Sequence, residues 1–207
     1  MKTKSKILLM LFLAGTSALY AGDGISSSAT SVNLKDAYIG ESTASAKYAA
    51  YAKKAQEEGF TKIALLFEAA SKAESIHASN HKAVMKQSGV NVPDLNPEFD
   101  VKSTRENLQD AINGESYEIT TMYPDFIKTA NSESVGLAQI SFNYAYQTEK
   151  KHKAMYEKAL KALDEKNENT LPDMYMVCST CGNTYEGEAP ARCGISMTSK
   201  DRFLTIK

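Results

Sequence analysis

The feature that most constrains this chain is a set of charged residues within helical stripes that otherwise look buried. The motif Glu-x-x-His occurs twice, ending at His77 and at His152, although the chain has only three histidines. Residues three apart on a helix share one face, so each motif directs a carboxylate and an imidazole the same way. Burying unpaired ionised carboxylates costs several kcal/mol, so the pattern favours cations in the interior over a solvated helix face.

Four segments carry apolar residues at helical spacing. They run over residues 33–58, 63–89, 103–119 and 138–163. Residues 90–102 contain two prolines and predict a long connection between the second and third segments. Four helices with one such crossover are typical of the ferritin-like bundle, so we predict an all-α fold of this type over residues 32–168.

The third segment has a clear start and an interruption. Ser103 and Glu106 form a capping box that opens a helix. Pro124 removes an amide donor and clashes with the preceding turn, so it should kink or restart this helix.

The N-terminal segment, residues 1–21, predicts a secretory signal peptide. Three lysines precede an apolar run, and small residues follow up to a cleavage point after Ala21. The run is shorter than the ~20 residues that span a bilayer, so we expect no membrane attachment after cleavage; the alternative is an uncleaved anchor. The predicted location is the periplasm or another exported compartment. The formal net charge of −1 gives no electrostatic argument for nucleic-acid binding.

The two remaining helical stripes also carry carboxylates, Glu41 on the first and Glu115 on the third. One Glu from each of two helices, with Glu-x-x-His from each of the other two, is the di-metal carboxylate pattern of helical bundles. Such mixed oxygen and nitrogen ligands suit iron or manganese, with zinc also possible. Glu118 is either a ligand that moves with oxidation state or an exposed residue. For His81, one turn beyond His77, we favour a supporting or surface residue over a direct ligand.

Residues 171–207 differ from the rest of the chain. They hold all three cysteines and two prolines, with no helical period. An odd number of cysteines excludes a fully paired disulfide framework. We therefore predict a separate small C-terminal module.

Taken together, these residues resemble the rubrerythrins over nearly the whole mature chain. The matching motifs are Gly40-Glu41-Ser42 with Tyr48, Glu74-x-x-His77, Ala111-Ile-Asn-Gly-Glu115-x-x-Glu118 with Tyr123, Glu149-x-x-His152, and Cys178-x-x-Cys181-Gly182 followed by Cys193. The tail is similar to the rubredoxin-like domain of that family. The resemblance implies a di-iron peroxidase that reduces hydrogen peroxide to water, with electrons from a mononuclear thiolate-bound iron and an unknown donor protein. It also implies a homodimer in which one subunit's tail approaches the other's di-iron site.

The resemblance further implies a ligand set and catalytic residues. The two iron ions would be held by Glu41, Glu74, His77, Glu115, Glu118, Glu149 and His152. Tyr48 and Tyr123 match tyrosines beside the iron pair that hydrogen-bond a ligand glutamate, and with the five glutamates they form the predicted catalytic set. Without the resemblance, both tyrosines would be read as ordinary aromatic core.

The tail departs from the family pattern Cys-Pro-x-Cys-Gly. Here the sequence is Cys193-Gly-Ile-Ser196-Met197, so Ser196 stands at the fourth thiolate and Met197 replaces a glycine that allows a tight turn. The site could bind iron through the three cysteines and Ser196 or water, or bind a structural zinc. A third alternative is a Cys178–Cys181 disulfide in an oxidising compartment. Of these three alternatives, only bound iron would allow the tail to pass electrons to the bundle site.

The leading prediction is therefore an exported, rubrerythrin-like di-iron peroxidase in oxidative-stress defence. The main alternative is a ferritin-like protein that binds or oxidises ferrous iron without peroxide turnover. A third possibility is a helical bundle that holds no metal and has a purely structural role.

Overall fold

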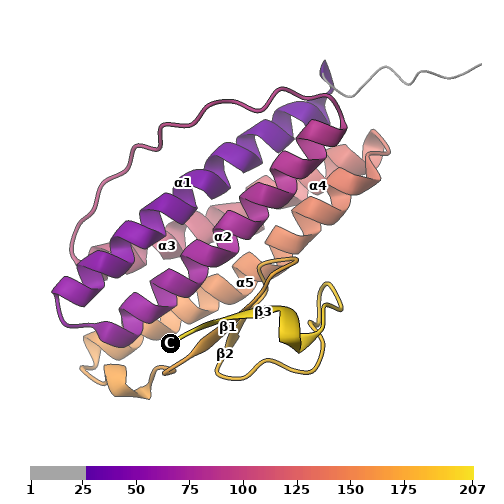
Figure 1. Cartoon of the computed structure of the whole chain (residues 1–207). Coiled ribbons are helices and arrows are strands. Elements are labelled where there is room, and N and C mark those ends of the chain that lie inside the picture. Colours follow the sequence, from indigo (N-terminus) through magenta and orange to yellow (C-terminus); the bar gives the residue numbers. More distant parts are fainter. Residues whose placement is uncertain (1–26) are drawn as a thin grey trace, which may run out of the picture.

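The structure, a computed structural model, describes residues 27–207 (Figure 1). The signal peptide predicted for residues 1–21 lies outside this range. Among the described residues, no helix combines the length and apolar character needed to cross a membrane.

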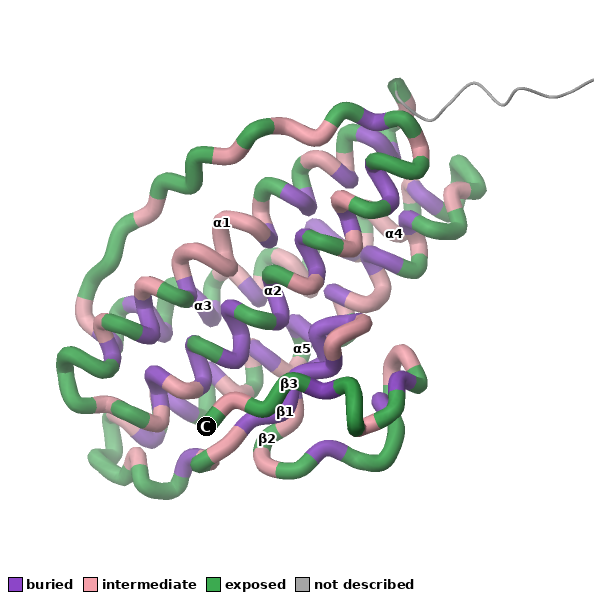
Figure 2. Tube along the Cα trace, in the orientation of Figure 1, coloured by how far each residue is buried: buried purple, intermediate pink, exposed green. Residues whose placement is uncertain are grey.

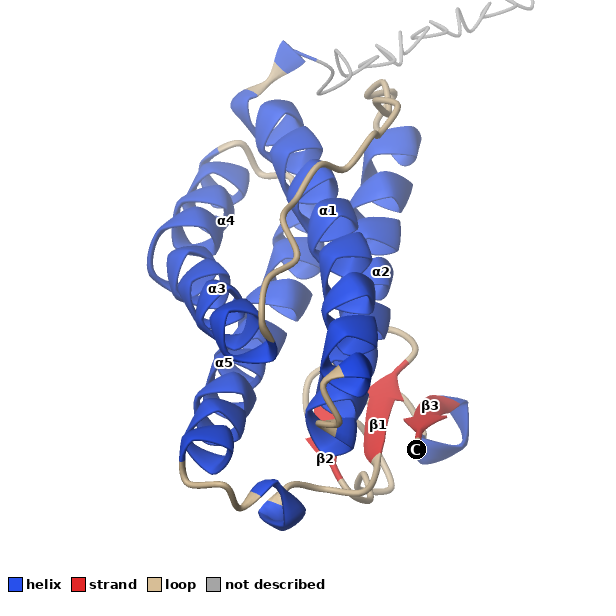
Figure 3. Ribbon diagram, turned by 90° about the vertical axis from the view of Figure 1, so that its left-hand side faces the viewer, coloured by secondary structure: helices blue, strands red, loops and turns tan. Residues whose placement is uncertain are grey.

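The bundle is built from five α-helices that form four rods. They are α1 (Ala29–Glu57), α2 (Thr61–Gln87), α3 (Thr104–Tyr117), α4 (Tyr123–Ser132) and α5 (Gly136–Asp164). Helices α3 and α4 continue one another through a π-helical turn, Glu118–Met122, and both pack against α5 (Figure 3). The connection from α2 to α3 runs along the bundle past α1 (Figure 1). The predicted four-helix bundle with a long crossover is confirmed.

Helix α1 begins earlier than predicted, at Ala29 instead of residue 32 or 33. Ser28 is its N-cap, with extended backbone and a side-chain oxygen that accepts the Ser31 N–H at 3.2 Å. A serine cap satisfies an amide that the first turn leaves without a partner, so the helix starts before the apolar stripe does.

The interruption in the third rod is a π-helical turn that joins α3 to α4 without a break in the helical backbone. The predicted capping box is present at the start of α3, because Ser103 and Glu106 bond each other's backbone N–H. Pro124 lies in the first turn of α4, directly after the π-helical turn, so its missing amide donor falls where the regular hydrogen-bond ladder already changes. The π-helical turn before it begins at Glu118, and such turns are frequent at functional sites.

Three helix N-termini are each capped by a glutamate from a distant segment. The bonds run from the Ala29 and Thr30 N–H groups to Glu133, from Lys62 and Ile63 to Glu168, and from Thr104 to Glu58, all at 2.8–3.2 Å. A carboxylate here satisfies free amides and opposes the positive end of the helix dipole. These hydrogen bonds connect helix ends to segments that are distant in sequence.

The buried residues follow the inward faces of the helices (Figure 2). Their apolar members form two clusters, one around Phe67, Leu108 and Tyr156 and the other around Leu34, Met85 and Phe142. The charged residues singled out in the sequence lie along the rods between these two clusters. The core therefore has two apolar halves with a polar layer between them.

The C-terminal module is a three-stranded antiparallel sheet in the order β2-β1-β3. Its strands are β1 (Tyr175–Cys178), β2 (Thr184–Glu186) and β3 (Phe203–Ile206), with single 3₁₀ turns at Glu168–Thr170 and Lys200–Arg202. The sheet packs on α2 and α5, and Tyr175 and Val177 join the apolar cluster around Phe67. One face of the sheet thus extends the bundle's core, while Met176, Cys178 and Phe203 belong to a separate cluster within the module.

Replacing Glu58 with Ala should lower the free energy of unfolding by about 1 kcal/mol, because the Thr104 N–H loses its acceptor. Burial raises the pKa of Glu58, but hydrogen bonds from Thr104 and Lys54 outweigh this and lower it below 4.5. A lowered pKa means that the stabilisation is complete above the ordinary value and is lost as pH falls through the folded value. Urea unfolding at neutral and acid pH measures both effects.

The matched control is Glu57→Ala, exposed on the same turn of α1, which should leave stability unchanged at both pH values. A Glu58→Ala effect that grew in acid would contradict the capping role.

Candidate metal centre

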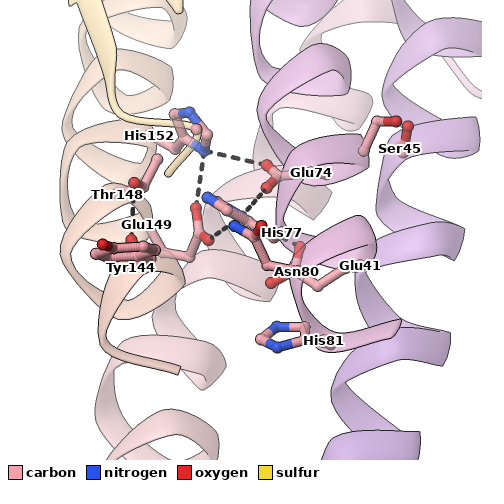
Figure 4. Close-up of polar contacts among 12 residues, drawn as sticks. Glu41, Ser45, Glu74, His77, Asn80, His81, Tyr144, Thr148, Glu149 and His152 are labelled. Atoms are coloured by element: carbon pink, nitrogen blue, oxygen red, sulfur yellow. Dashed lines mark hydrogen bonds and ion pairs between the residues drawn. The ribbon is translucent and has the colours of Figure 1, made fainter. Parts of the chain in front are cut away.

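Six acidic and imidazole side chains from four helices converge in the polar layer. Figure 4 shows five of them, Glu41, Glu74, His77, Glu149 and His152. They are Glu41 on α1, Glu74 and His77 on α2, Glu115 on α3, and Glu149 and His152 on α5. Each is at most 2% exposed, although residues of these types are almost never so buried unless paired.

These six residues form two overlapping sets, each with one ligand atom per residue and all four atoms within 4.8 Å of one another. The first set is Glu41, Glu74, His77 and Glu149, and the second is Glu74, Glu115, Glu149 and His152. We call these the first and second subsites. Glu74 and Glu149 belong to both.

Each shared glutamate directs one oxygen to each subsite. Glu74 Oε2 lies 2.9 Å from His77 Nδ1, and its Oε1 lies 3.0 Å from His152 Nδ1 (Figure 4). Glu149 places Oε1 2.9 Å from His77 Nδ1 and Oε2 2.9 Å from His152 Nδ1. This is the arrangement of two carboxylates that bridge a pair of ions.

Hydrogen bonds on the far side of each imidazole fix its tautomer. His77 Nε2 lies 3.0 Å from the Cys181 carbonyl oxygen, which can only accept, so Nε2 carries the hydrogen. His152 Nε2 lies 2.9 Å from Thr184 Oγ1, whose own hydrogen goes to the Gly182 carbonyl, so this Nε2 also donates. Both Nδ1 lone pairs are left facing the cluster, as metal ligation requires.

The inward-facing atoms of both subsites lack hydrogen-bond partners. Among the described residues these atoms are Glu41 Oε2, both oxygens of Glu74 and of Glu149, Glu115 Oε2, and Nδ1 of His77 and His152. A buried polar atom without a partner costs about 1–3 kcal/mol, so a concentration of them in one place is tolerable only with a counter-charge. The residues therefore fit a pair of metal ions.

The pKa values show the same electrostatic problem. Burial raises the pKa of Glu41 to about 8, and burial together with Glu149 and Glu74 raises that of Glu115 well above its usual range. Burial would also raise the pKa of Glu74, but the imidazoles of His152 and His77, at 3.0 and 2.9 Å from its oxygens, lower it to about 2. The carboxylates ionise only where positive charge compensates them, which divalent cations would do for all of them.

Two tyrosines hold the glutamates that are not shared. Tyr123 donates a hydrogen bond to Glu41 Oε1, and Tyr48 donates one to Glu115 Oε1 at 2.9 Å. Each glutamate thereby keeps its second oxygen free for its subsite. Both tyrosines also belong to the apolar clusters, so the two roles expected for them coexist.

Glu118 is not brought into either set. It is half-buried at the start of the π-helical turn. Burial and the charges of Glu41 and Glu149 raise its pKa well above the usual range, so it faces the same layer from outside the two subsites.

The tail brings its predicted ligands together. The three cysteines are free, and their sulfur atoms lie within 4.8 Å of one another. Ser196 Oγ is 3.3 Å from Cys178 Sγ and takes the position of a fourth ligand. A hydrogen bond with Cys181 lowers the pKa of Cys178 to about 4, and the thiolate is the form that binds metals. The donor set fits a metal held by three sulfur atoms and one oxygen.

The tail docks directly on both subsites of its own chain, since His77 bonds the Cys181 carbonyl and His152 bonds Thr184 of β2. Besides the His77–Cys181 contact, Asn80 Nδ2 donates to the Thr180 carbonyl at 2.9 Å, and Lys151 Nζ donates to Asn183 Oδ1 at 2.6 Å. The resemblance had implied that the tail reaches a partner's site. In this chain the tail contacts its own bundle; its approach to a partner's site and the homodimer both stay predictions.

Close approach at the docking contact depends on Gly182. Its φ is +75°, and a β-carbon there would overlap the His77 imidazole and lie 3.1 Å from the Ala73 carbonyl oxygen. In the sequence this glycine stands out only as part of the Cys-x-x-Cys-Gly motif, and no pattern marks Asn80, Lys151 or Thr184. These polar residues have no spacing signal, because their partners lie in a distant part of the chain.

A four-helix bundle with two carboxylates shared between two histidine-containing subsites defines the class of ferritin-like di-metal carboxylate proteins. Within that class, this chain belongs to the rubrerythrin family, whose family model, Rubrerythrin, matches residues 33–160. The resemblance drawn from the sequence is thereby confirmed.

Known relatives cover most of the chain. It is 33% identical to Rubrerythrin-2 of Clostridium acetobutylicum over 171 residues, covering 82% of this chain and 92% of that protein. It is 36% identical to nigerythrin of Nitratidesulfovibrio vulgaris over 179 residues, or 83% of each chain.

Solved structures agree with these relatives. The fully reduced, all-ferrous structure of nigerythrin superposes with a TM-score of 0.76 at 33% identity, covering 98% of this chain and 100% of that one. The bacterioferritin BfrA of Mycobacterium tuberculosis has a TM-score of 0.61 at 18% identity, over 68% of this chain and 89% of its own. The second match shows the fold alone.

The shared glutamates predict a stoichiometry. Glu149→Ala should lose both bound metal ions, because Glu149 serves both subsites, whereas Glu115→Ala should retain the ion of the first subsite. Metal analysis after anaerobic reconstitution with ferrous iron measures this, with the tail metal counted separately in a Cys178→Ala background.

The matched control is Glu157→Ala, which removes an exposed carboxylate from the same helix as Glu149 and should keep both ions. Equal losses in Glu115→Ala and Glu149→Ala would contradict the bridging arrangement.

The ligand loop of the tail is strained at Met197. Its φ is +60°, a region that costs an L-residue about 1–2 kcal/mol, and its side chain is exposed. Met197→Gly should therefore raise the free energy of unfolding by about 1 kcal/mol, whereas Met197→Ala, which keeps a β-carbon, should not. Thermal unfolding followed by circular dichroism distinguishes them, and equal effects of the two substitutions would exclude backbone strain.

Proposed function

We propose that this protein is a di-iron peroxidase that reduces hydrogen peroxide to water. The observation that carries the proposal is the pair of subsites bridged by Glu74 and Glu149 in a chain of the rubrerythrin family. Iron held there would supply two electrons to one O–O bond. The reaction balances as hydrogen peroxide, two protons and two electrons giving two water molecules.

The chain's own residues would hold the ligand glutamates in position and keep bulk water away from the metal site. Tyr123 and Tyr48 restrain the glutamate of each subsite and hold a proton at their hydroxyl oxygens. The apolar clusters on either side exclude bulk water, which strengthens every electrostatic interaction inside. Glu118 lies just outside the subsites, and in this proposal it is an additional carboxylate that is available to bind the metal.

The proposal includes electron entry through the tail. The three cysteines and Ser196 would hold the iron that supplies electrons, and a donor protein would reduce it. The proposed route into the bundle is the hydrogen bond from His77 Nε2–H to the Cys181 carbonyl. This bond joins a residue of the bundle's first subsite to a residue of the cysteine site.

Steady-state peroxide consumption by iron-loaded protein tests the activity. With an artificial electron donor, the parent should turn over, and Glu149→Ala should lose at least about a hundredfold in kcat/KM if transition-state stabilisation worth about 3 kcal/mol is removed. Glu157→Ala should retain parent activity. Ferrous oxidation without peroxide turnover by the parent would instead favour the ferritin-like alternative.

A second variant separates the relay from the peroxide site. Gly182→Ala removes no proposed metal ligand, but its β-carbon should push the tail away from His77. We expect slower reoxidation of the reduced tail centre by peroxide, followed by the ferric–thiolate absorption bands, with bundle metal content unchanged. Parent rates in Gly182→Ala, or an absence of those bands in the parent, would exclude this relay.

We also propose export, on the basis of the basic and apolar leader over residues 1–21. Expressed with its leader in a bacterium with an outer membrane, the protein should fractionate with the periplasm and begin at Gly22. N-terminal sequencing of the fractionated protein measures this. A cytoplasmic product that retains residues 1–21 would overturn the export proposal.

A further inference from the structure

The third histidine of the chain is buried but belongs to neither subsite. His81 lies one turn beyond His77 on α2 and is 0% exposed. Side chains from two other helices surround it, namely Tyr123 on α4 and Ser141 and Phe142 on α5. A polar ring in this position needs partners for both of its nitrogen atoms.

Both nitrogens have partners, and together they form a chain of hydrogen bonds that ends at the first subsite. Ser141 Oγ lies 2.8 Å from His81 Nδ1, and His81 Nε2 lies 3.2 Å from the Tyr123 hydroxyl. Tyr123 in turn bonds Glu41 Oε1. The chain crosses the bundle through four helices, α5, α2, α4 and α1.

The direction of each hydrogen bond follows from the number of hydrogens available. Tyr123 has one hydroxyl hydrogen and gives it to Glu41, so its oxygen accepts from His81 Nε2–H. Nδ1 of a neutral imidazole then accepts from the Ser141 hydroxyl. Burial, and secondarily the positive charge of His77, lower the pKa of His81 to about 3, which keeps the ring neutral as this order requires.

Tyr48 bonds Glu115 as Tyr123 bonds Glu41, but within residues 27–207 no histidine is hydrogen-bonded to the Tyr48 hydroxyl. The rings beside Tyr48 are those of Tyr51, Phe67 and Tyr156. The two subsites therefore differ in what fixes the tyrosine hydroxyl.

We propose that His81 is a positioning residue for the first subsite: with Ser141 it fixes the Tyr123 hydroxyl as a donor to Glu41 Oε1, so that Glu41 presents only Oε2 to the metal. Glu41 Oε2 is buried without a hydrogen-bond partner and lies 3.5 Å from His77 Nδ1. The inference rests on the di-metal site of the proposed function, but not on peroxide turnover.

Binding of Co²⁺ to single subsites tests this role. Glu115→Ala leaves the first subsite to be measured, and Glu41→Ala leaves the second, both with Cys178→Ala to remove the tail site. Adding His81→Leu should weaken Co²⁺ binding about tenfold in the Glu115→Ala background, the effect of one lost hydrogen bond, and leave the Glu41→Ala background unchanged. The visible absorption of bound Co²⁺ gives both affinities.

Two further variants separate positioning from packing. His81→Gln can donate to Tyr123 and accept from Ser141, so it should restore most of the lost affinity. Ser141→Ala keeps the imidazole but releases Nδ1, so it should weaken the same subsite less than His81→Leu does. Circular dichroism checks that each variant retains its helices.

Equal weakening of both subsites by His81→Leu, or no weakening of the first, would overturn the proposal. A parent that bound no Co²⁺ at its bundle site would overturn the metal site together with this inference. Because peroxide plays no part in the measurement, a protein that binds Co²⁺ as expected but fails to consume peroxide would refute only the proposed activity.

Discussion

The structure depends on the compensation of negative charge inside an apolar bundle. Four carboxylates and two imidazoles lie between two apolar clusters, and their inward-facing atoms have no hydrogen-bond partner in the part of the chain that the structure describes. Apolar packing alone would tolerate some sliding of one helix past another. A shift of one turn, by contrast, would move Glu74 away from His152 and leave charges buried without compensation. The polar layer therefore sets the register of the rods, and the same requirement creates the metal site.

The bundle and most of its site could be predicted because their signals are local. A period of 3.6 residues identifies each rod, and Glu-x-x-His is a spacing within one helix turn. The start of α1 was predicted too late because a serine cap lies outside the apolar stripe. The docking of the tail could not be predicted, since the Asn80 and Lys151 contacts join segments far apart in sequence and obey no period. For His81 a supporting or surface residue was predicted, but its partners could not be, because they depend on which side chains of α4 and α5 meet α2.

The two subsites are related but not equivalent. Each subsite has one histidine, one glutamate that is hydrogen-bonded to a tyrosine, and one carboxylate oxygen from each of Glu74 and Glu149. Their outer contacts differ: His77 bonds a backbone carbonyl in the loop that carries the cysteines, whereas His152 bonds a threonine hydroxyl. Both contacts are with the tail, but only that of the first subsite lies at one of the cysteines, and Glu118 lies close enough to the layer to respond to its charge.

The docking of the tail also has a thermodynamic meaning. Tyr175 and Val177 complete one of the bundle's apolar clusters, and Cys181 bonds His77, so the module is not a tethered carrier that swings between partners. If occupancy of the cysteine site changes how firmly this loop sits on α2, linkage requires a reciprocal change. The affinity of the first subsite and the affinity of the cysteine site would then be altered by the same factor, and the two centres would behave as a cooperative pair.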